Sequence, residues 1–261
     1  MDNEIDIQMI PKKIHYCWFG GGEMPELAKR CVASWHEKMP DWTYVLWNEE
    51  SFDVGSAPRY VREAYEAKKF AFVSDYVRLH ALEKEGGVYL DVDVEVYKSF
   101  EPLLMNHAFT GFEGNKRCSI MTSVLASEPN GRWVSEAKHE YDTRPFVMAD
   151  GSLDLTTNTA YFTDRMEEQG FAADGKEQDF GGLHIYPVEY FCPMQTSGEY
   201  LRTENTYCEH TGLHSWSTDE NWKSRLLKHV SPAMRTKIIL LKRKIEGGRW
   251  CGRGQRKRGQ E

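Results

Sequence analysis

The feature that most constrains this sequence is the segment 86–95, Gly-Gly-Val-Tyr-Leu-Asp-Val-Asp-Val-Glu. Apolar residues occupy every second position from Val88 onward, and this period of two predicts a β-strand with one apolar face. The other face then carries three carboxylates, of Asp91, Asp93 and Glu95. Burying carboxylates without partners is costly, so either this face lies in solvent, as on an edge strand, or a positive group neutralises it. A divalent cation that also binds a diphosphate suits these oxygen ligands best.

A helix is predicted over residues 71–85, directly before the strand, because its apolar residues recur at the spacing of a helical face. The glycine pair at 86–87 should end this helix, since glycine readily adopts the positive φ of a helix cap and of a tight turn. Asp75 and Arg78 are three residues apart and therefore share a helix face. They are either a surface ion pair of little energetic value or a pair that binds the hydroxyl groups of a sugar.

Further motifs extend this pattern on both sides. The core is Ser74-Asp75-x-x-Arg78 followed by Gly86-Gly87-x-Tyr89-Leu90-Asp91-x-Asp93. The flanking segments are Ile10–Gly21, Pro40–Trp47, and Thr206-Tyr207-x-x-His210 with Ser215-Trp216. In this order and spacing they resemble glycosyltransferase family 32, which contains yeast mannosyltransferases and bacterial capsule transferases and is similar in this region to the clostridial glucosylating toxins. The resemblance is dense over residues 10–104 and sparse from there to 216.

The resemblance implies a division of roles among the site residues. Asp93 and His210 are expected to bind Mn²⁺ or Mg²⁺, and Asp91 to contact the ribose, the sugar, the metal or a metal-bound water. Asp75 and Arg78 should orient the donor sugar by hydrogen bonds, and together with Asp91 they form the expected catalytic set. The residues expected to bind the nucleotide sugar are Trp18, Ser74, Asp75, Arg78, Tyr89, Asp91 and Trp216.

Two of these positions, Trp18 and His210, have plain alternatives, and one further segment has no assigned role. Trp18 follows an apolar run, so by itself it is expected in the core, whereas the resemblance implies that it stacks on the nucleotide base. From their four-residue separation alone, His210 and His214 are expected to be ordinary polar loop residues. The closing motif of the family places its histidine at the position of His210, which favours His210 as the metal ligand. Residues 157–159, Thr-Asn-Thr, depart from the Thr-Gly-Pro turn of the family, so their role stays open.

The activity that the resemblance implies is metal-dependent and retaining: a sugar passes from a nucleoside-diphosphate sugar, with UDP-hexose favoured, to a glycan acceptor in capsular or cell-surface polysaccharide synthesis. No carboxylate is recognisable as a nucleophile, and the resemblance implies attack from the face of the leaving phosphate, without a covalent intermediate. A catalytically inactive protein that binds nucleotide sugars or carbohydrates is the alternative. A haloacid-dehalogenase-type phosphatase is excluded, because Val94-Glu95 follow the motif where that class needs Gly-Thr.

The remaining pattern predicts an α/β fold. Strands are expected at 13–19, 42–47, 86–95 and 109–112, and helices at 24–39, 57–69, 71–85, 130–141 and within 154–168. This alternation predicts a mostly parallel sheet with helices on both sides, and the resemblance implies a GT-A type transferase domain over residues 1–234. The six cysteines form no Cys-x-x-Cys pair, and the sequence has neither a long apolar run nor a signal-peptide layout. We therefore expect free thiols and a cytoplasmic location.

The last 27 residues, 235–261, differ in charge from the rest of the chain. They hold ten basic residues and two glutamates, a net charge of +8, although the whole chain carries −7. Ser231-Pro232 is a good helix start, and Met234, Ile238, Leu241 and Ile245 then share one helical face. This pattern predicts an amphipathic anchor on an anionic membrane surface, near a lipid-linked glycan acceptor; the alternative is a helix packed on the domain. The acidic body argues against nucleic acid as a partner.

Overall fold

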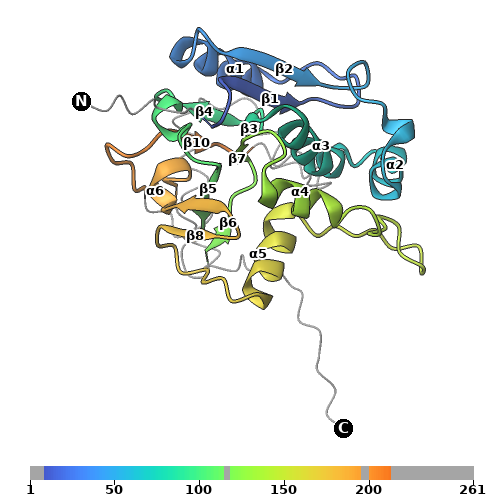
Figure 1. Cartoon of the computed structure of the whole chain (residues 1–261). Coiled ribbons are helices and arrows are strands. Elements are labelled where there is room, and N and C mark those ends of the chain that lie inside the picture. The colour runs from blue at the N-terminus through green and yellow to red at the C-terminus, as the bar shows by residue number, and fades with distance from the viewer. Residues whose placement is uncertain (1–8, 115–117, 195–199, 213–261) are drawn as a thin grey trace, which may run out of the picture.

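The computed structural model describes residues 9–114, 118–194 and 200–212, which form one large sheet, a two-stranded ribbon and the surrounding helices (Figure 1). The strands are β1 (Lys13–Cys17), β2 (Thr43–Trp47), β3 (Gly87–Leu90), β4 (Val94–Val96), β5 (Ala108–Glu113), β6 (Ser119–Ile120), β7 (Val124–Ser127), β8 (Gln178–Phe180), β9 (Leu183–Tyr186) and β10 (Cys208–His210). The α-helices are α1 (Glu26–Lys38), α2 (Arg59–Glu66), α3 (Phe70–Glu85), α4 (Arg132–His139), α5 (Asn158–Glu168) and α6 (Val188–Phe191).

The large sheet has the strand order β2-β1-β3-β7-β5-β9-β8, with β6 paired to β5. β1 runs parallel to both β2 and β3, and β5 runs parallel to β9. β7 is antiparallel to both β3 and β5, so β5 and β9 point in the same direction as β1, β2 and β3. The prediction of an α/β fold with a mostly parallel sheet is therefore confirmed, with β6, β7 and β8 as the strands that run the other way.

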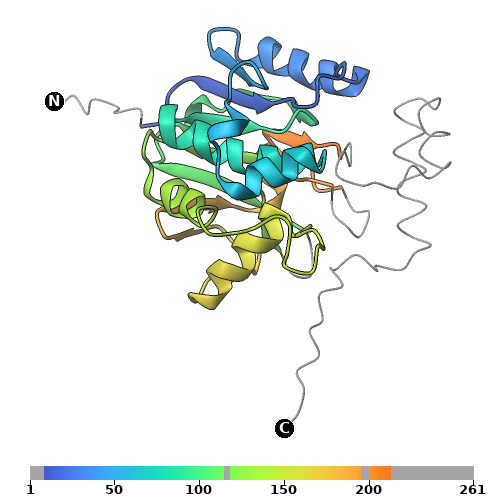
Figure 2. The same cartoon turned by 90° about the vertical axis from the view of Figure 1, so that its right-hand side faces the viewer.

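Helices cover both faces of this sheet, as predicted. α2, α3 and α4 bury one face, where Tyr60, Val77 and Val134 belong to a common apolar core. On the other face Trp35 of α1 and Phe191 of α6 share a second core with the ribbon of β4 and β10. Figure 2 looks onto the first side and shows α2 and α3 in front of the strands. No helix of the described segments has the length and apolar composition needed to cross a membrane.

The predicted single strand over 86–95 is wrong, because the chain turns after Leu90. The amide of Val94 donates to the carbonyl of Asp91 at 3.0 Å, which closes a tight turn through Val92 and Asp93. β3 before the turn belongs to the large sheet, and β4 after it pairs with β10. The alternating pattern fits both arrangements, since valines resume their inward positions in β4. The turn places the carboxylates of Asp91 and Asp93 just beyond the end of β3, at the edge of the large sheet, whereas Glu95 lies within β4.

The predicted end of the helix at the glycine pair is confirmed. α3 ends at Glu85, and the amide of Gly86 donates to the carbonyl of Leu82 at 2.9 Å. Gly86 and Gly87 have φ values of 61° and 115°, which side chains disfavour. A Cβ atom on Gly87 would also lie 2.6 Å from the carbonyl oxygen of Lys13 in β1. The pair therefore allows α3 to turn directly into β3 beside the first strand.

His15 ties this turn to the first two strands. Its Nε2 lies 2.8 Å from the carbonyl oxygen of Gly86, and its Nδ1 accepts a hydrogen bond from Trp47 Nε1 at 3.0 Å. The two contacts require the neutral imidazole with its proton on Nε2. Burial lowers the pKa of His15 to about 4, although the Gly86 carbonyl acts in the opposite direction.

We expect this histidine to make folding sensitive to acid. Because the pKa of His15 is lower in the folded chain than the ordinary value of 6.5, its contribution is complete above pH 6.5 and is lost as the pH falls toward 4. The loss amounts to about 3 kcal/mol. Urea unfolding of wild type and His15→Gln should show a difference in stability that shrinks by this amount between pH 7 and 4. Parallel pH curves, or an NMR titration of His15 with a pKa near 6.5, would contradict the assignment.

Candidate active site

The candidate site lies at the edge of the sheet where parallel strands end. Trp18 directly follows β1, and Asp91 directly follows β3. Thr122 and Ser123 precede the antiparallel strand β7 at the same edge, and the amide of Asp91 donates to the carbonyl of Ser123 at 2.9 Å. The carboxyl ends of strands in an open α/β sheet are the usual location of ligand sites.

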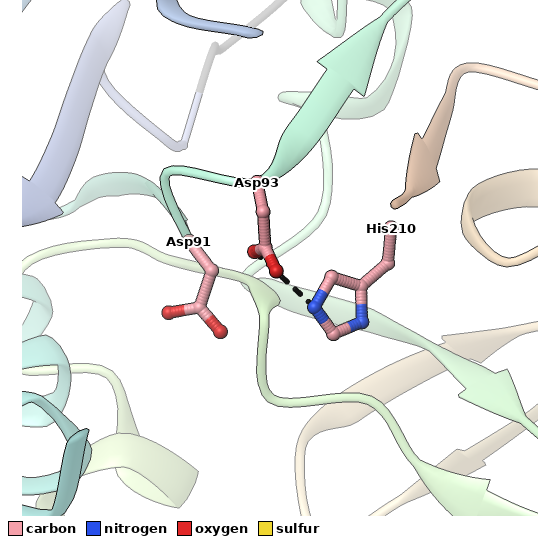
Figure 3. A group of neighbouring side chains, drawn as sticks. All are labelled: Asp91, Asp93 and His210. Atoms are coloured by element: carbon pink, nitrogen blue, oxygen red, sulfur yellow. Dashed lines mark ion pairs between the residues drawn. The ribbon is translucent and has the colours of Figure 1, made fainter. Parts of the chain in front are cut away.

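Asp91, Asp93 and His210 come together at this edge, although the histidine is more than a hundred residues further along the chain (Figure 3). One ligand atom from each residue lies within 4.8 Å of the others, and His210 Nε2 is 3.2 Å from Asp93 Oδ1. The pairing of β10 with β4 sets His210 opposite Val94. The amide and the hydroxyl of Thr211 both donate to the carbonyl of Asp93, at 2.9 and 2.7 Å, which fixes the turn against β10.

The charge of this group suits a divalent cation. Burial lowers the pKa of His210, but Asp93, and after it Asp91, raise that pKa to about 9. In this arrangement the imidazole is protonated at neutral pH and forms an ion pair with Asp93. Two carboxylates and an imidazole are a ligand set for Mn²⁺ or Mg²⁺, whose binding would displace that proton. The residues present therefore fit the predicted cation.

Asp75 and Arg78 form a buried ion pair next to the cation ligands, so the surface-pair alternative is wrong. Arg78 is 4% exposed and Asp75 is 7% exposed. Arg78 Nη2 lies 2.9 Å from Asp75 Oδ1 and 3.4 Å from Asp91 Oδ1. Its Nη1 donates to the carbonyl of Thr122 at 2.6 Å, and the guanidinium lies 4.7 Å from the ring centroid of Tyr89. A single arginine thus fixes both carboxylates relative to the end of β3.

Asn158 is a site residue whose role the sequence left open. Asn158 is the first residue of α5. Its backbone N–H donates to Asp75 Oδ2 at 3.2 Å, and its side-chain Nδ2 donates to the backbone carbonyl of Asp75 at 2.7 Å. Tyr141 donates to Asn158 Oδ1, which orients the side chain. Burial raises the pKa of Asp75 to about 6, and Arg78 and the Asn158 amide act against this rise. The signal in the sequence is Thr157, whose hydroxyl caps the helix that brings Asn158 to Asp75.

The other predicted donor-binding residues are placed as follows. Trp18 is partly exposed, belongs to neither apolar core, and its Nε1 donates to the carbonyl of Gly22. Tyr89 is buried under Arg78 and donates to Asp91 Oδ1 at 2.8 Å. Ser74 Oγ donates to the carbonyl of Phe70 within α3, at 3.1 Å. Trp216 and His214 lie outside the described residues, and the roles assigned to all of these residues stay predictions.

Comparison with known proteins agrees with the sequence motifs. Residues 25–110 match the family model described as a glycosyltransferase sugar-binding region containing a DXD motif. Inositol phosphoceramide mannosyltransferase 3 of Schizosaccharomyces pombe is 36% identical over 99 residues, which are 36% of this chain and 27% of that protein. Mannosyl phosphorylinositol ceramide synthase SUR1 of Saccharomyces cerevisiae is 31% identical over 152 residues, 54% of this chain and 37% of that protein. The chain thus spans well under half the length of these relatives.

Among solved structures, the PaToxG glycosyltransferase is 17% identical and covers 62% of this chain and 70% of its own, with a TM-score of 0.47. The family model spans α1 to β5 and includes both Asp91 and Asp93, the two acids of its DXD motif. The predicted resemblance is confirmed over residues 25–110, which match the model of a glycosyltransferase sugar-binding region containing the DXD motif.

Proposed function

We propose that this protein is a metal-dependent, retaining glycosyltransferase that moves a hexose from a nucleoside-diphosphate sugar, with UDP-hexose favoured, to a glycan acceptor in the synthesis of a cell-surface polysaccharide such as a capsule. The observation that carries the proposal is the placement of the buried Asp75–Arg78 pair beside the Asp91, Asp93 and His210 group. One group of side chains suits a cation on a diphosphate, and the adjacent pair suits the hydroxyl groups of a sugar.

Each site residue has a proposed role in the reaction. Asp93, His210 and, directly or through water, Asp91 would hold Mn²⁺ or Mg²⁺, which as a Lewis acid neutralises the departing diphosphate. Asp75 and Arg78 orient the donor sugar, and Arg78 adds positive charge near the phosphates. The bond between the anomeric carbon and the diphosphate oxygen breaks, an acceptor oxygen bonds to the same face of that carbon, and the acceptor proton passes to the diphosphate. Trp18, at the end of β1, stacks on the base.

A thermal-shift screen tests the proposal. UDP, UDP-glucose, UDP-galactose and GDP-mannose are each added with and without Mn²⁺, and hydrolysis of the sugar nucleotides is followed in parallel. A donor at 100 times its dissociation constant adds about 2.7 kcal/mol of stability. We expect stabilisation and slow hydrolysis that both need the metal. Metal-dependent binding without any turnover would favour the alternative, an inactive nucleotide-sugar-binding protein, and binding of none would contradict the proposal.

The acceptor is proposed to be a lipid-linked glycan at the inner face of the cell membrane, where the enzyme would be a peripheral cytoplasmic protein. The two yeast relatives are named for reactions on inositol phosphoceramide, which is a lipid. The predicted membrane anchor at 235–261, and the proposed domain boundary at 234, lie outside the described residues. The support for the anchor is the basic, amphipathic sequence of that segment.

Sedimentation with vesicles measures this membrane contact. Full-length protein should bind vesicles that contain anionic lipid, with an affinity that falls as salt is added, and a chain ending at residue 234 should stay in the supernatant. Neutral vesicles are the control. If both chains stay in the supernatant, or if the shortened one unfolds in a thermal melt, the predicted helix belongs to the domain and the proposed membrane contact fails.

A further inference from the structure

Glu113 places a carboxylate at the site edge that none of the predicted roles uses. It is the last residue of β5, which points in the same direction as β3, so Glu113 and Asp91 lie at the same edge of the sheet. Side chains alternate along a strand, so Glu113 shares a face with Phe109 and Gly111. Both of these pack against Phe191 of α6, and α6 also contacts β10. Glu113 therefore lies on the side of the sheet where β10 carries His210.

The surroundings of Glu113 differ from those of the other site carboxylates. Its side chain is partly buried, and the charged groups that act on it are His210, Asp91 and Arg78. Burial raises the pKa of Glu113, and His210 acts against this rise. Asp75 and Asp91 both pair with Arg78, whereas within the described part of the chain no group forms a hydrogen bond or ion pair with the Glu113 carboxylate.

A partly buried carboxylate without a hydrogen-bond donor carries a free-energy cost, and such costs are typical of sites that complete their contacts with a ligand. In the proposed site, Asp91, Asp93 and His210 would bind the cation. Asp75 and Arg78 would bind the donor sugar. No side chain has yet been assigned to the acceptor glycan, whose hydroxyl groups are hydrogen-bond donors. We infer that Glu113 is the acceptor-contacting residue of this site and accepts a hydrogen bond from a hydroxyl group of the acceptor glycan. The inference rests on the proposed glycosyltransferase function.

Hydrolysis of the donor allows this inference to be tested before the natural acceptor is known, because water then takes the acceptor's place. One hydrogen of the water is donated to Glu113, which holds the oxygen in position. That oxygen bonds to the anomeric carbon, the bond from this carbon to the diphosphate breaks with its electron pair staying on the diphosphate, and the other hydrogen passes to the diphosphate oxygen. With a glycan acceptor, Glu113 holds the attacking hydroxyl before the attack, and this hydroxyl passes its proton to the diphosphate oxygen as its oxygen bonds to the anomeric carbon.

The experiment compares wild type with Glu113→Gln, using UDP-glucose, UDP-galactose and GDP-mannose with Mn²⁺. We expect the kcat of hydrolysis to fall at least tenfold, while the dissociation constant of the same sugar nucleotide, from calorimetry, stays within twofold. The melting temperature should not fall, since the substitution removes a charge that no group in the described segments pairs with. Glu128→Gln is the matched control: Glu128 follows β7 at the opposite edge of the sheet, where its Oε1 lies 2.9 Å from His107 Nδ1. It should leave kcat unchanged.

Three results would overturn the inference. A kcat within twofold of wild type means that Glu113 does not hold the nucleophile. A dissociation constant that rises in parallel with the loss of kcat means that Glu113 serves the cation or the donor instead. A lower melting temperature with a proportional loss of all functions means that its role is structural. If the wild type itself neither binds nor hydrolyses any of the three sugar nucleotides, the proposed function fails, and the inference fails with it.

Discussion

Replacing Asp93 with asparagine is expected to lower sugar transfer and donor hydrolysis by at least about 10³-fold, or about 4 kcal/mol of activation free energy. Asp93 supplies one of the two carboxylates of the cation group and lies 3.2 Å from His210. Asparagine keeps the shape of the side chain but removes the negative charge that a divalent cation requires. The fold should survive, because the Asp93 carbonyl still accepts the hydrogen bonds from the amide and the hydroxyl of Thr211 that hold this turn against β10.

The effect of Asp93→Asn is measured as turnover and as Mn²⁺ affinity by electron paramagnetic resonance. Asp150→Asn is the control, because Asp150 lies in an exposed loop and, among the described residues, its carboxylate accepts hydrogen bonds from Ser152 alone. The control should retain wild-type activity. Full activity of the Asp93 variant in chelator-treated buffer would end the metal-dependent mechanism.

His210→Ala should likewise weaken Mn²⁺ and diphosphate binding, and more than His214→Ala does. The opposite ranking would show that the family's closing motif is offset by four residues in this chain.

Local chemistry explains which parts of this site could be predicted from the sequence. The helix, the glycine pair and β3 follow from spacing and backbone preference, and the three-residue spacing of Asp75 and Arg78 already places them on one helix face. The proximity of His210 to Asp93 could not come from spacing, since it depends on the pairing of β10 with β4. The prediction that His210 lies near Asp93 came from the resemblance to the family, whose motif places a metal-binding histidine at this position.

The features that the sequence did not predict all depend on long-range packing. The turn after Leu90 leaves the alternation of valines intact, so the period of two cannot distinguish one strand from two. Asn158 reads as an ordinary residue at a helix start, and only the fold brings it to Asp75. Glu113 ends an unremarkable strand, and its position beside the site depends on the strand order of the sheet.

Substitution of Arg78 is expected to affect both folding and turnover. Arg78→Ala leaves Asp75 buried without its positive partner, which should lower the free energy of unfolding by about 3–5 kcal/mol. Arg78→Lys retains a charge but cannot contact Asp75, Asp91 and the Thr122 carbonyl at once, because an ammonium group lacks the fork of the guanidinium. The lysine variant should therefore fold, with a kcat at least about 100-fold lower, corresponding to about 3 kcal/mol.

Urea unfolding and steady-state kinetics separate the two effects, and Arg165→Ala serves as the control for the loss of a guanidinium. The Arg165 side chain is 45% exposed, and its ion pairs within residues 9–114, 118–194 and 200–212 are with surface carboxylates, so its removal should change stability by less than about 1 kcal/mol.

Arg78→Lys and Trp18→Ala together test whether separate residues bind the sugar and the nucleotide. UDP affinity should be nearly unchanged in Arg78→Lys, because Arg78 is assigned to the sugar. Trp18→Ala should weaken UDP binding by roughly 1–3 kcal/mol if the base stacks on this side chain. It should leave stability almost intact, since Trp18 is partly exposed and belongs to neither core. Equal losses of UDP affinity in both variants would mean that Arg78 holds the diphosphate as much as the sugar, and the division of roles would have to be redrawn around Asp75 and Asn158.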